Sequence, residues 1–421
     1  MAPSTIALII SAGTVVLFVW GIIPLPITAI GAALTMAVFG CIPFSSAFAG
    51  FSNDALLMVI GSMVIGETLF VTGVAERIGA AIIRRVGTNE RLFVVVCVVL
   101  AVVLSAFLSN TAVVAMLLPI VSAVAAASNG AITKKNSFMA IGFAANIGGG
   151  MTLVGSTTNV IGQGLLVDNG LEPMSFFELL PGSIPRFLFI IVFYATVGYG
   201  IQQKIFNFEE ITEEAGAESE ERQYSKSKML ISIGILVFAV VGFCSGIWTI
   251  GGVAMAAAVL CTVTGCISMQ EMFRRIDWGT VWVMAGSLGL AAGISQSGAG
   301  QVIADFFVGF LGTDASMFKL MTVFTLLSVF LANLMSSTAA MAMLAPIAMS
   351  VCGAYGFAVK PVFMVIIWSL NLAFLTPTAT VPITMTFQGG YQFLDYTRVG
   401  VFVMIGCLIL SIASYPFVFS L

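Results

Sequence analysis

Long apolar runs separated by short clusters of charge constrain this chain more than any other feature. Examples are Met229–Val241, Val253–Cys266 and Val399–Ile412. A helix needs about 20 apolar residues to cross the ~30 Å of hydrocarbon in a bilayer, where backbone polar groups must be bonded internally. Of the 421 residues, 59% are hydrophobic and 8% charged, and the short alternating segments of a β-barrel are missing. These observations predict an all-α polytopic membrane protein.

Several classes of chemistry are excluded by residue content. The chain has no histidine, which removes imidazole metal sites, Ser-His-Asp triads and histidine proton relays. The predicted spans hold no convincing carboxylate pair, so an intramembrane enzyme is disfavoured and no catalytic residue or resident cofactor is assigned. A basic nucleic-acid-binding face is also missing.

One acidic stretch divides the chain almost in half. Hydrophobicity collapses between Phe206 and Lys228, and seven glutamates occur there: Glu209, Glu210, Glu213, Glu214, Glu218, Glu220 and Glu221. We therefore predict a first repeat at 1–205, a cytoplasmic Glu-rich linker at 206–228 and a second repeat at 229–421.

The two halves resemble each other when slid by about 225 positions, as internal repeats do. The matches keep their order along the chain. They include Gly61-Ser62 with Gly286-Ser287, Asn146 with Asn371, and, after a two-residue gap, Ser109-Asn110-Thr111-Ala112 with Ser336-Ser337-Thr338-Ala339.

Positive charge predicts the orientation of the halves. If each half crosses the membrane an odd number of times, the second is inverted, which gives about ten spans. All but three of the 16 Lys and Arg residues then lie on the cytoplasmic side, with only Arg186, Lys319 and Lys360 outside. We expect a bacterial inner-membrane protein with both termini external and surface helices at 76–85 and 300–312 on opposite faces.

A polar triplet, Ser109-Asn110-Thr111, interrupts the apolar segment Phe93–Ala126. Basic clusters flank both ends of this segment, which predicts a re-entrant hairpin with the triplet at its tip. Ser109 suits the N-cap of the second arm, and a helix N-terminus carries about half a positive charge that favours anions.

Two further polar segments interrupt apolar spans at matching places. Glycines and hydroxyls break the first at 147–159, and prolines break the second at 375–384. Small polar clusters often serve only to let membrane helices approach. Two hairpins and two broken helices in symmetric positions instead indicate a transport site between the repeats, near the middle of the bilayer, with no lysine or arginine in it.

These segments carry a family resemblance. The tip Ser109-Asn110-Thr111, the stretch Gly155–Asn159, Phe51–Asn53, Thr72–Ile78 and Ile276–Trp278 together resemble the divalent anion:sodium symporter (DASS) family of the ion transporter superfamily. The resemblance covers nearly the whole chain. It implies an inverted-repeat homodimer in membrane lipid that moves di- or tricarboxylates, or sulfate, usually with Na+, by an elevator-like shift.

The resemblance also implies site residues. A first sodium site would lie at Ser105, Ser109, Asn110 and Gly155, and a second at Ala332, Ser337 and Ala379. The substrate anion would contact Asn110, Thr111, Ser156, Thr157, Ser337, Thr338 and Thr380. Sodium is a hard cation that prefers oxygen ligands, and broken helices supply carbonyl oxygens.

The chain departs from the family pattern in places that bear on ion coupling. Ser337 stands where the second triplet has Asn, Thr157-Thr158 replace a usual Pro-Pro, and Val381 replaces a proline. Two alternatives to sodium-coupled import stay open. One is a cation/proton antiporter or arsenite-type exporter with Glu67 as proton carrier, and the other is a sodium-independent dicarboxylate exchanger.

Overall fold

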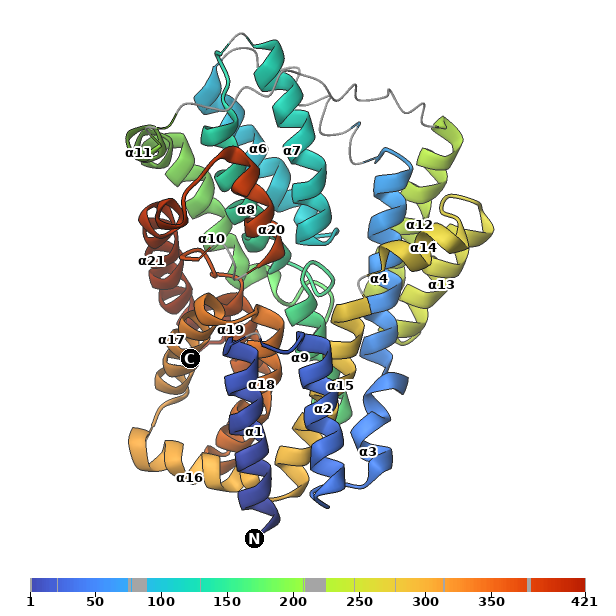
Figure 1. The fold of residues 1–421 in the computed structure, drawn as a ribbon, viewed down its shortest axis with the longest axis vertical. Helices are drawn as coiled ribbons and strands as arrows, with labels where there is room; N and C mark the ends of the chain where they lie inside the picture. The colour runs from blue at the N-terminus through green and yellow to red at the C-terminus, as the bar shows by residue number, and fades with distance from the viewer. Residues whose placement is uncertain are drawn as a thin grey trace.

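The protein is built from helices throughout its described part. The computed structural model describes residues 2–20, 22–74, 77, 89–128, 130–206, 208, 225–245, 247–276, 278–312, 315–376 and 380–420. Every regular element in these ranges is a helix, and none is a strand (Figure 1). The expected all-α fold is confirmed. Most of the predicted surface helix at 76–85 and of the acidic stretch, together with Ala379, lies outside the described residues.

The first half contains an ordered series of helices. They are α1 (Pro3–Trp20), α2 (Leu25–Val38), α3 (Phe44–Phe48), η1 (Ala49–Ser52), α4 (Asp54–Val71), α6 (Glu90–Ser105), α7 (Asn110–Ala127), α8 (Lys134–Gly149), α9 (Thr157–Asp168), α10 (Leu180–Phe193), the π-helical turn η2 (Tyr194–Gly198) and α11 (Tyr199–Ile205).

The second half repeats this order. Its helices are α12 (Lys226–Ser245), α13 (Ile250–Val263), α14 (Met269–Arg275), α15 (Trp278–Gln296), α16 (Ala299–Leu311), α17 (Met317–Leu334), α18 (Ser337–Tyr355), α19 (Val359–Leu370), α20 (Val381–Met385), η3 (Thr386–Gly389) and α21 (Phe393–Val418). In Figure 1 α1 begins at the lower end of the molecule and α12 at the upper end, so the second half runs inverted to the first.

Length and composition identify the helices that can cross a membrane. Among the described residues six are long and apolar enough: Phe44–Val71, Leu180–Ile205, Lys226–Phe243, Met317–Leu334, Ser337–Tyr355 and Phe393–Val418. Shorter apolar helices, including Pro3–Phe18, Leu25–Val38 and Ile250–Val263, accompany them. The chain is therefore an integral membrane protein.

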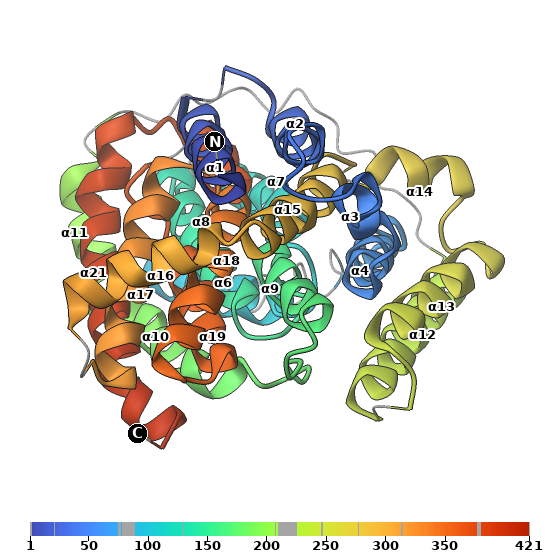
Figure 2. The ribbon, with the colours of Figure 1, turned by 90° about the horizontal axis from the view of Figure 1, so that it is seen from below.

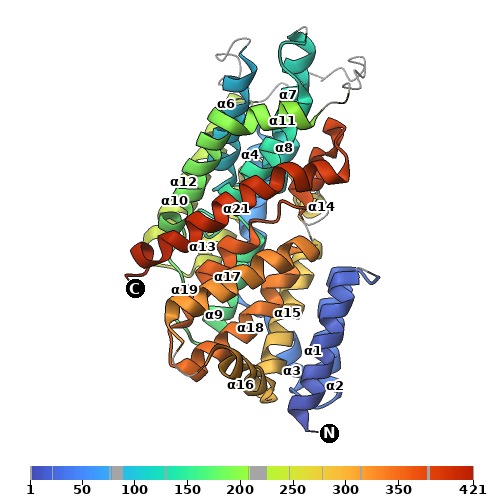
Figure 3. The same ribbon diagram turned by 90° about the vertical axis from the view of Figure 1, so that its left-hand side faces the viewer.

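Two helical hairpins enter from opposite ends. The α6–α7 hairpin lies at the upper end and the α17–α18 hairpin at the lower end, beside the surface helix α16 (Figures 1 and 3). Each tip contains a serine that caps the second arm, as the polar triplets predict.

Small residues let the halves pack closely. Helix α2 packs on α15, and α13 packs on α4, at one side of the molecule (Figure 2). A Cβ atom on Gly61 would lie 2.4 Å from the Ala254 carbonyl carbon, and one on Gly286 would lie 2.5 Å from that of Ala29. The matched glycines thus meet matched alanines, because only small residues allow such close approach in membranes.

The helix that follows each break packs against helices of the opposite half. Helix α9 of the first half packs against α18 and α19, whereas α20 of the second half packs against α7 and α8. Each hairpin is therefore completed by the broken helix of the opposite half, which brings both breaks to the centre of the structure.

Candidate functional site

The first hairpin tip presents the start of a long helix to the site. Helix α7 begins at Asn110, and Oγ of Ser109 accepts a hydrogen bond from the backbone N–H of Ala112 at 3.2 Å. The other amides of a helical first turn have no partner within the helix and carry partial positive charge. This helix start can therefore hold an anion without a basic side chain.

Oxygen atoms converge on the side-chain amide of Asn110. Oγ of Ser105 contacts it, and its Nδ2 lies 3.4 Å from Oδ1 of Asn146. With the amide turned over, its nitrogen reaches the carbonyl oxygens of Gly155 and Ala145, each at 3.1 Å. Hydroxyl and carbonyl oxygens gathered in this way are the ligands that hard cations prefer.

Two glycines make room for this oxygen cluster. A Cβ atom on Gly149 would lie 2.3 Å from Oδ1 of Asn110, and one on Gly155 would lie 2.7 Å from the carbonyl oxygen of Ser105. Any side chain at either place would occupy the cluster. Glycine is required here for close approach rather than for its backbone angles.

The first break is held by a buried amide. Helix α8 ends at Gly149 and α9 begins at Thr157. Nδ2 of the fully buried Asn159 lies 2.7 Å from the carbonyl oxygens of both Gly149 and Thr152. These contacts satisfy carbonyl groups that the helix end leaves free.

A hydrogen bond joins the two breaks. Asn146, which is 1% exposed, donates from Nδ2 to Oγ1 of Thr380 at 3.0 Å, across 234 residues of sequence. On the other side, a Cβ atom on Gly150 would lie 3.6 Å from Nδ2 of Asn371. The structure therefore brings Ser105, Asn110 and Gly155 into one cluster, which Asn146 links to Thr380.

The second tip is organised differently from the first. Oγ of Ser336 caps α18 by accepting from the N–H of Ala339 at 3.2 Å, and Ser337 donates to the carbonyl oxygen of Leu370 at 2.9 Å. Ala332 is buried in the last turn of α17. Ala379, the third predicted ligand of the second cation site, lies outside the described residues.

Asn333 holds the second break. Its Oδ1 accepts from the N–H of Leu375 at 2.8 Å, and its backbone oxygen accepts from Oγ1 of Thr376 at 3.1 Å. Asn333 thus has the role in the second half that Asn159 has in the first.

The remaining predicted substrate ligands lie at helix starts. Thr111, Thr157 and Thr338 are half-buried in the first turns of α7, α9 and α18. Ser156 is the residue before α9, and its Oγ lies 2.9 Å from Oγ1 of Thr158.

The sequence analysis did not identify three asparagines whose side-chain amides hold the two breaks: Asn146, Asn159 and Asn333. It used Asn146 only as a match between the repeats and Asn159 only as part of the family motif. The sequence did offer a signal for them. An asparagine inside an apolar span indicates a bonded polar group, because a buried amide without hydrogen-bond partners is unfavourable there.

Glu67 lies apart from the contacts that define this cluster. Its carboxylate pairs with Nη1 of Arg275 at 3.1 Å, and that guanidinium lies over the ring of Phe70. Arg275 also pairs with Glu271 at 3.3 Å. The Glu67 carboxylate therefore ties α4 to the end of α14.

Arg186, predicted among the charges on the outer side, lies in α10, where it is 3% exposed and packs inside the protein. The carbonyl oxygen of Gly150, in the first break, is linked to it through Ser183.

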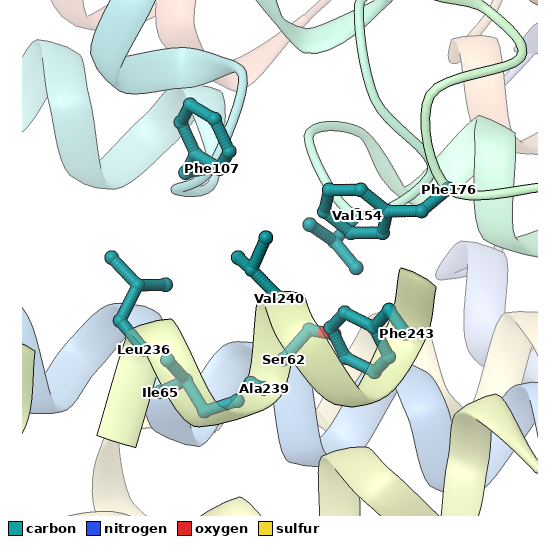
Figure 4. Close-up of a pocket in the computed structure, with 9 residues that line it drawn as sticks. All are labelled: Ser62, Ile65, Phe107, Val154, Phe176, Leu236, Ala239, Val240 and Phe243. Carbon is teal, nitrogen blue, oxygen red and sulfur yellow. The ribbon is translucent and has the colours of Figure 1, made fainter. Parts of the chain in front are cut away.

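An apolar seam separates this cluster from α4 and α12 (Figure 4). Phe107 and Val154 flank the hairpin tip and the first break, and they face Leu236 and Val240 of α12 across the seam. Among the described residues, Ser62 is the one polar side chain that lines it.

Comparison with known proteins gives consistent matches. The family model described as "Citrate transporter" matches residues 15–352. An uncharacterized transporter of Haemophilus influenzae is 25% identical over 94% of this chain and 87% of its own length. The sodium-dependent dicarboxylate transporter SdcS of Staphylococcus saprophyticus is 25% identical over 81% of this chain and 72% of its own length. Two other relatives, at 30% identity, are matched over less than a third of their own length.

A solved structure shares the fold. The YdaH transporter of Alcanivorax borkumensis superposes with a TM-score of 0.65 over 96% of this chain and 98% of that chain, at 11% identity.

Proposed function

This chain belongs to the citrate transporter family, and on that premise we propose that it is a secondary active transporter that imports a small di- or tricarboxylate together with Na+. The observation that carries the proposal is the cluster of oxygens from Ser105, Gly155, Ala145 and Asn146 around Asn110, directly beside the start of α7. The oxygens suit a sodium ion and the helix start suits a carboxylate, so the two ions would bind side by side.

Coupling to a cation follows from the charge of the substrate. Moving an anion toward a negative interior costs about 2.3 kcal/mol per charge per 100 mV, so a divalent anion needs accompanying cations. The similarity to a relative named as a sodium-dependent dicarboxylate transporter supports both the ion and the substrate class.

The proposed mechanism is elevator-like alternating access. The hairpins and breaks would move as one unit past α4 and α12, and the apolar seam in Figure 4 supports this because few polar contacts would have to break there. We further propose two repeats at 1–205 and 229–421, a homodimer, and a bacterial inner-membrane location with both termini external.

Two alternatives make different demands on the structure. A proton-coupled antiporter or exporter needs a free carboxylate, and the pairing of Glu67 with Arg275 argues against that role. A sodium-independent exchanger is favoured by one feature of the sequence, the serine at 337 where the second triplet of the family has Asn.

The test is uptake of succinate into proteoliposomes that contain the purified protein. Replacement of Na+ by choline at fixed pH is expected to abolish uptake. Unchanged uptake in choline would reject sodium coupling and favour the exchanger. A parallel thermal-shift screen against succinate, citrate and sulfate, each with and without Na+, would identify the substrate by the largest sodium-dependent stabilisation.

A further inference from the structure

Arg186 is an unusual charge for a membrane protein. Among the described residues, only Arg186 and Asp395 are charged side chains that are buried. Asp395 lies 3.5 Å from Nη1 of Arg398 and accepts the backbone N–H of Gln392. By contrast, no carboxylate of the described residues lies within ion-pair distance of Arg186.

The contacts of Arg186 satisfy it only in part. Its Nη2 donates to the carbonyl oxygen of Gly182 at 3.1 Å and to Oγ of Ser183 at 3.0 Å. The guanidinium lies 5.1 Å from the ring centroid of Trp368, in the opposite half. Its buried Nε has no hydrogen-bond partner among the described residues.

An unpaired cation in such a place is costly. Removing a charge from water is strongly unfavourable, and a cation–π contact and neutral hydrogen bonds offset only part of that cost. Ionisable residues inside membrane proteins usually pair with another charge or mark an ion pathway. The uncompensated charge of Arg186 is therefore expected to be offset by an anion that binds nearby during function.

A short path leads from Arg186 to the site. Ser183 donates from Oγ to the carbonyl oxygen of Gly150 at 2.7 Å, and Gly150 caps the end of α8. The preceding residue, Gly149, is the glycine that leaves room for the Asn110 side chain. Two hydrogen bonds through Ser183 thus link the guanidinium to Gly150, and the neighbouring Gly149 borders the oxygen cluster.

We propose that Arg186 is a fixed positive charge behind the site and that this charge makes the site selective for divalent over monovalent anions. The proposal rests on the proposed function and names how that site selects its substrate. Charge interactions are weakly screened inside the protein, and a dianion interacts twice as strongly as a monoanion with the same fixed charge. Arg186 acts as a positioning charge, since its hydrogen bonds end at Gly182 and Ser183, outside the oxygen cluster.

The surroundings of Arg186 hold the guanidinium in place. A Cβ atom on Gly182 would lie 2.2 Å from the Trp368 ring, so the glycine admits this ring beside the arginine. Nε1 of Trp368 donates to the carbonyl oxygen of Leu179 at 3.2 Å. A purely structural clamp would use the same contacts, so the test must separate charge from packing.

The sharpest test neutralises the charge while the arginine stays in place. Cys407 of α21 is fully buried, and α21 packs against α10, the helix that carries Arg186. Cys407→Asp would give the guanidinium a carboxylate partner, and Cys407→Asn is the matched control of nearly the same shape. Both full-length variants are assayed in proteoliposomes for uptake of succinate and of its monovalent monomethyl ester.

We expect Cys407→Asp to raise the succinate concentration for half-maximal uptake about tenfold, the effect of one poorly screened charge near a bound ion. The monomethyl ester should be affected less, and Cys407→Asn should stay near wild type for both substrates. Equal behaviour of the Asp and Asn variants would overturn the proposal, because it would show that packing alone matters.

Two substitutions of Arg186 itself test the proposal independently, through the preference for succinate over its monomethyl ester. Arg186→Met should lose the preference for the dianion, whereas Arg186→Lys should keep it. A folded Arg186→Met protein with the wild-type preference would also overturn the inference. A wild-type protein without succinate uptake would instead reject the proposed function itself, so the two failures are distinguishable.

Discussion

Asn146 of α8 donates a hydrogen bond to Thr380, just before α20, and at its other end it meets the amide of Asn110. One buried side chain thus joins the first hairpin tip, the first break and the second break. Loss of this amide would leave polar groups of both halves without partners.

Substitution of this amide is expected to impair transport and stability together. Asn146→Ala should lower succinate uptake at least tenfold and reduce the free energy of unfolding by about 1–3 kcal/mol, the cost of unsatisfied buried polar groups. Uptake and thermal denaturation measure the two effects. The control is Asn169→Ala at the exposed end of α9, and equal effects of both variants would contradict a special role for Asn146.

The hydroxyl of Ser105 should matter for the cation more than for the anion. Ser105 is fully buried against Asn110, whereas Ser245 is exposed and bonds only to the nearby backbone groups of Gly242 and Ile247. We expect Ser105→Ala to raise the Na+ concentration for half-maximal uptake about tenfold, because one oxygen ligand is lost. Sodium titrations of uptake at saturating succinate test this, and Ser245→Ala should match wild type. An unchanged Na+ dependence would remove Ser105 from the cation site.

A single methyl group at Gly149 should block the site. The added Cβ would displace the Asn110 side chain, so Gly149→Ala is expected to abolish sodium-dependent stabilisation by succinate in a thermal-shift assay. Gly234→Ala in α12 is the matched control, since a Cβ there meets nothing within 4 Å. It should keep the response and gain slightly in helix stability. A full ligand response of Gly149→Ala would show that Asn110 can move without loss.

The Glu67–Arg275 pair should be dispensable for transport. Both side chains are about a quarter exposed, at 22% and 26%, so the pair contributes at most about 1 kcal/mol. We expect Glu67→Gln to keep sodium-driven uptake within about threefold of wild type. Abolished uptake in this variant, with normal folding, would favour the proton-coupled alternative.

Local patterns predicted the helices and their interruptions well. The hairpin tip expected at Ser109-Asn110-Thr111 lies at the start of α7, whose N-cap is Ser109, and the break expected at 147–159 contains the interruption between α8 and α9. The second break begins earlier than expected, since α19 ends at Leu370 and Asn371 is already outside it. Prolines drew attention to 375–384, but Pro382 lies in the first turn of α20, where proline is well tolerated.

The site could be predicted only in outline. Ser105, Asn110 and Gly155 came from a family resemblance, and the structure brings them together. Asn333 carried no motif, and its role appears only when α17 and the second break are placed side by side. The contribution of Ala145 was equally hidden, because a backbone carbonyl has no signature in sequence.

The sequence alone determined that this chain spans a membrane, that its order of helices repeats, and where polar residues interrupt them. These properties depend on hydrophobicity and on glycine, serine and proline acting over a few neighbouring residues. Only the tertiary structure decided that Asn146 meets Thr380, that Glu67 pairs with Arg275, and that Arg186 is buried behind the first break. The physical reason is that these contacts join distant helices, and helix packing rather than local preference selects the partners.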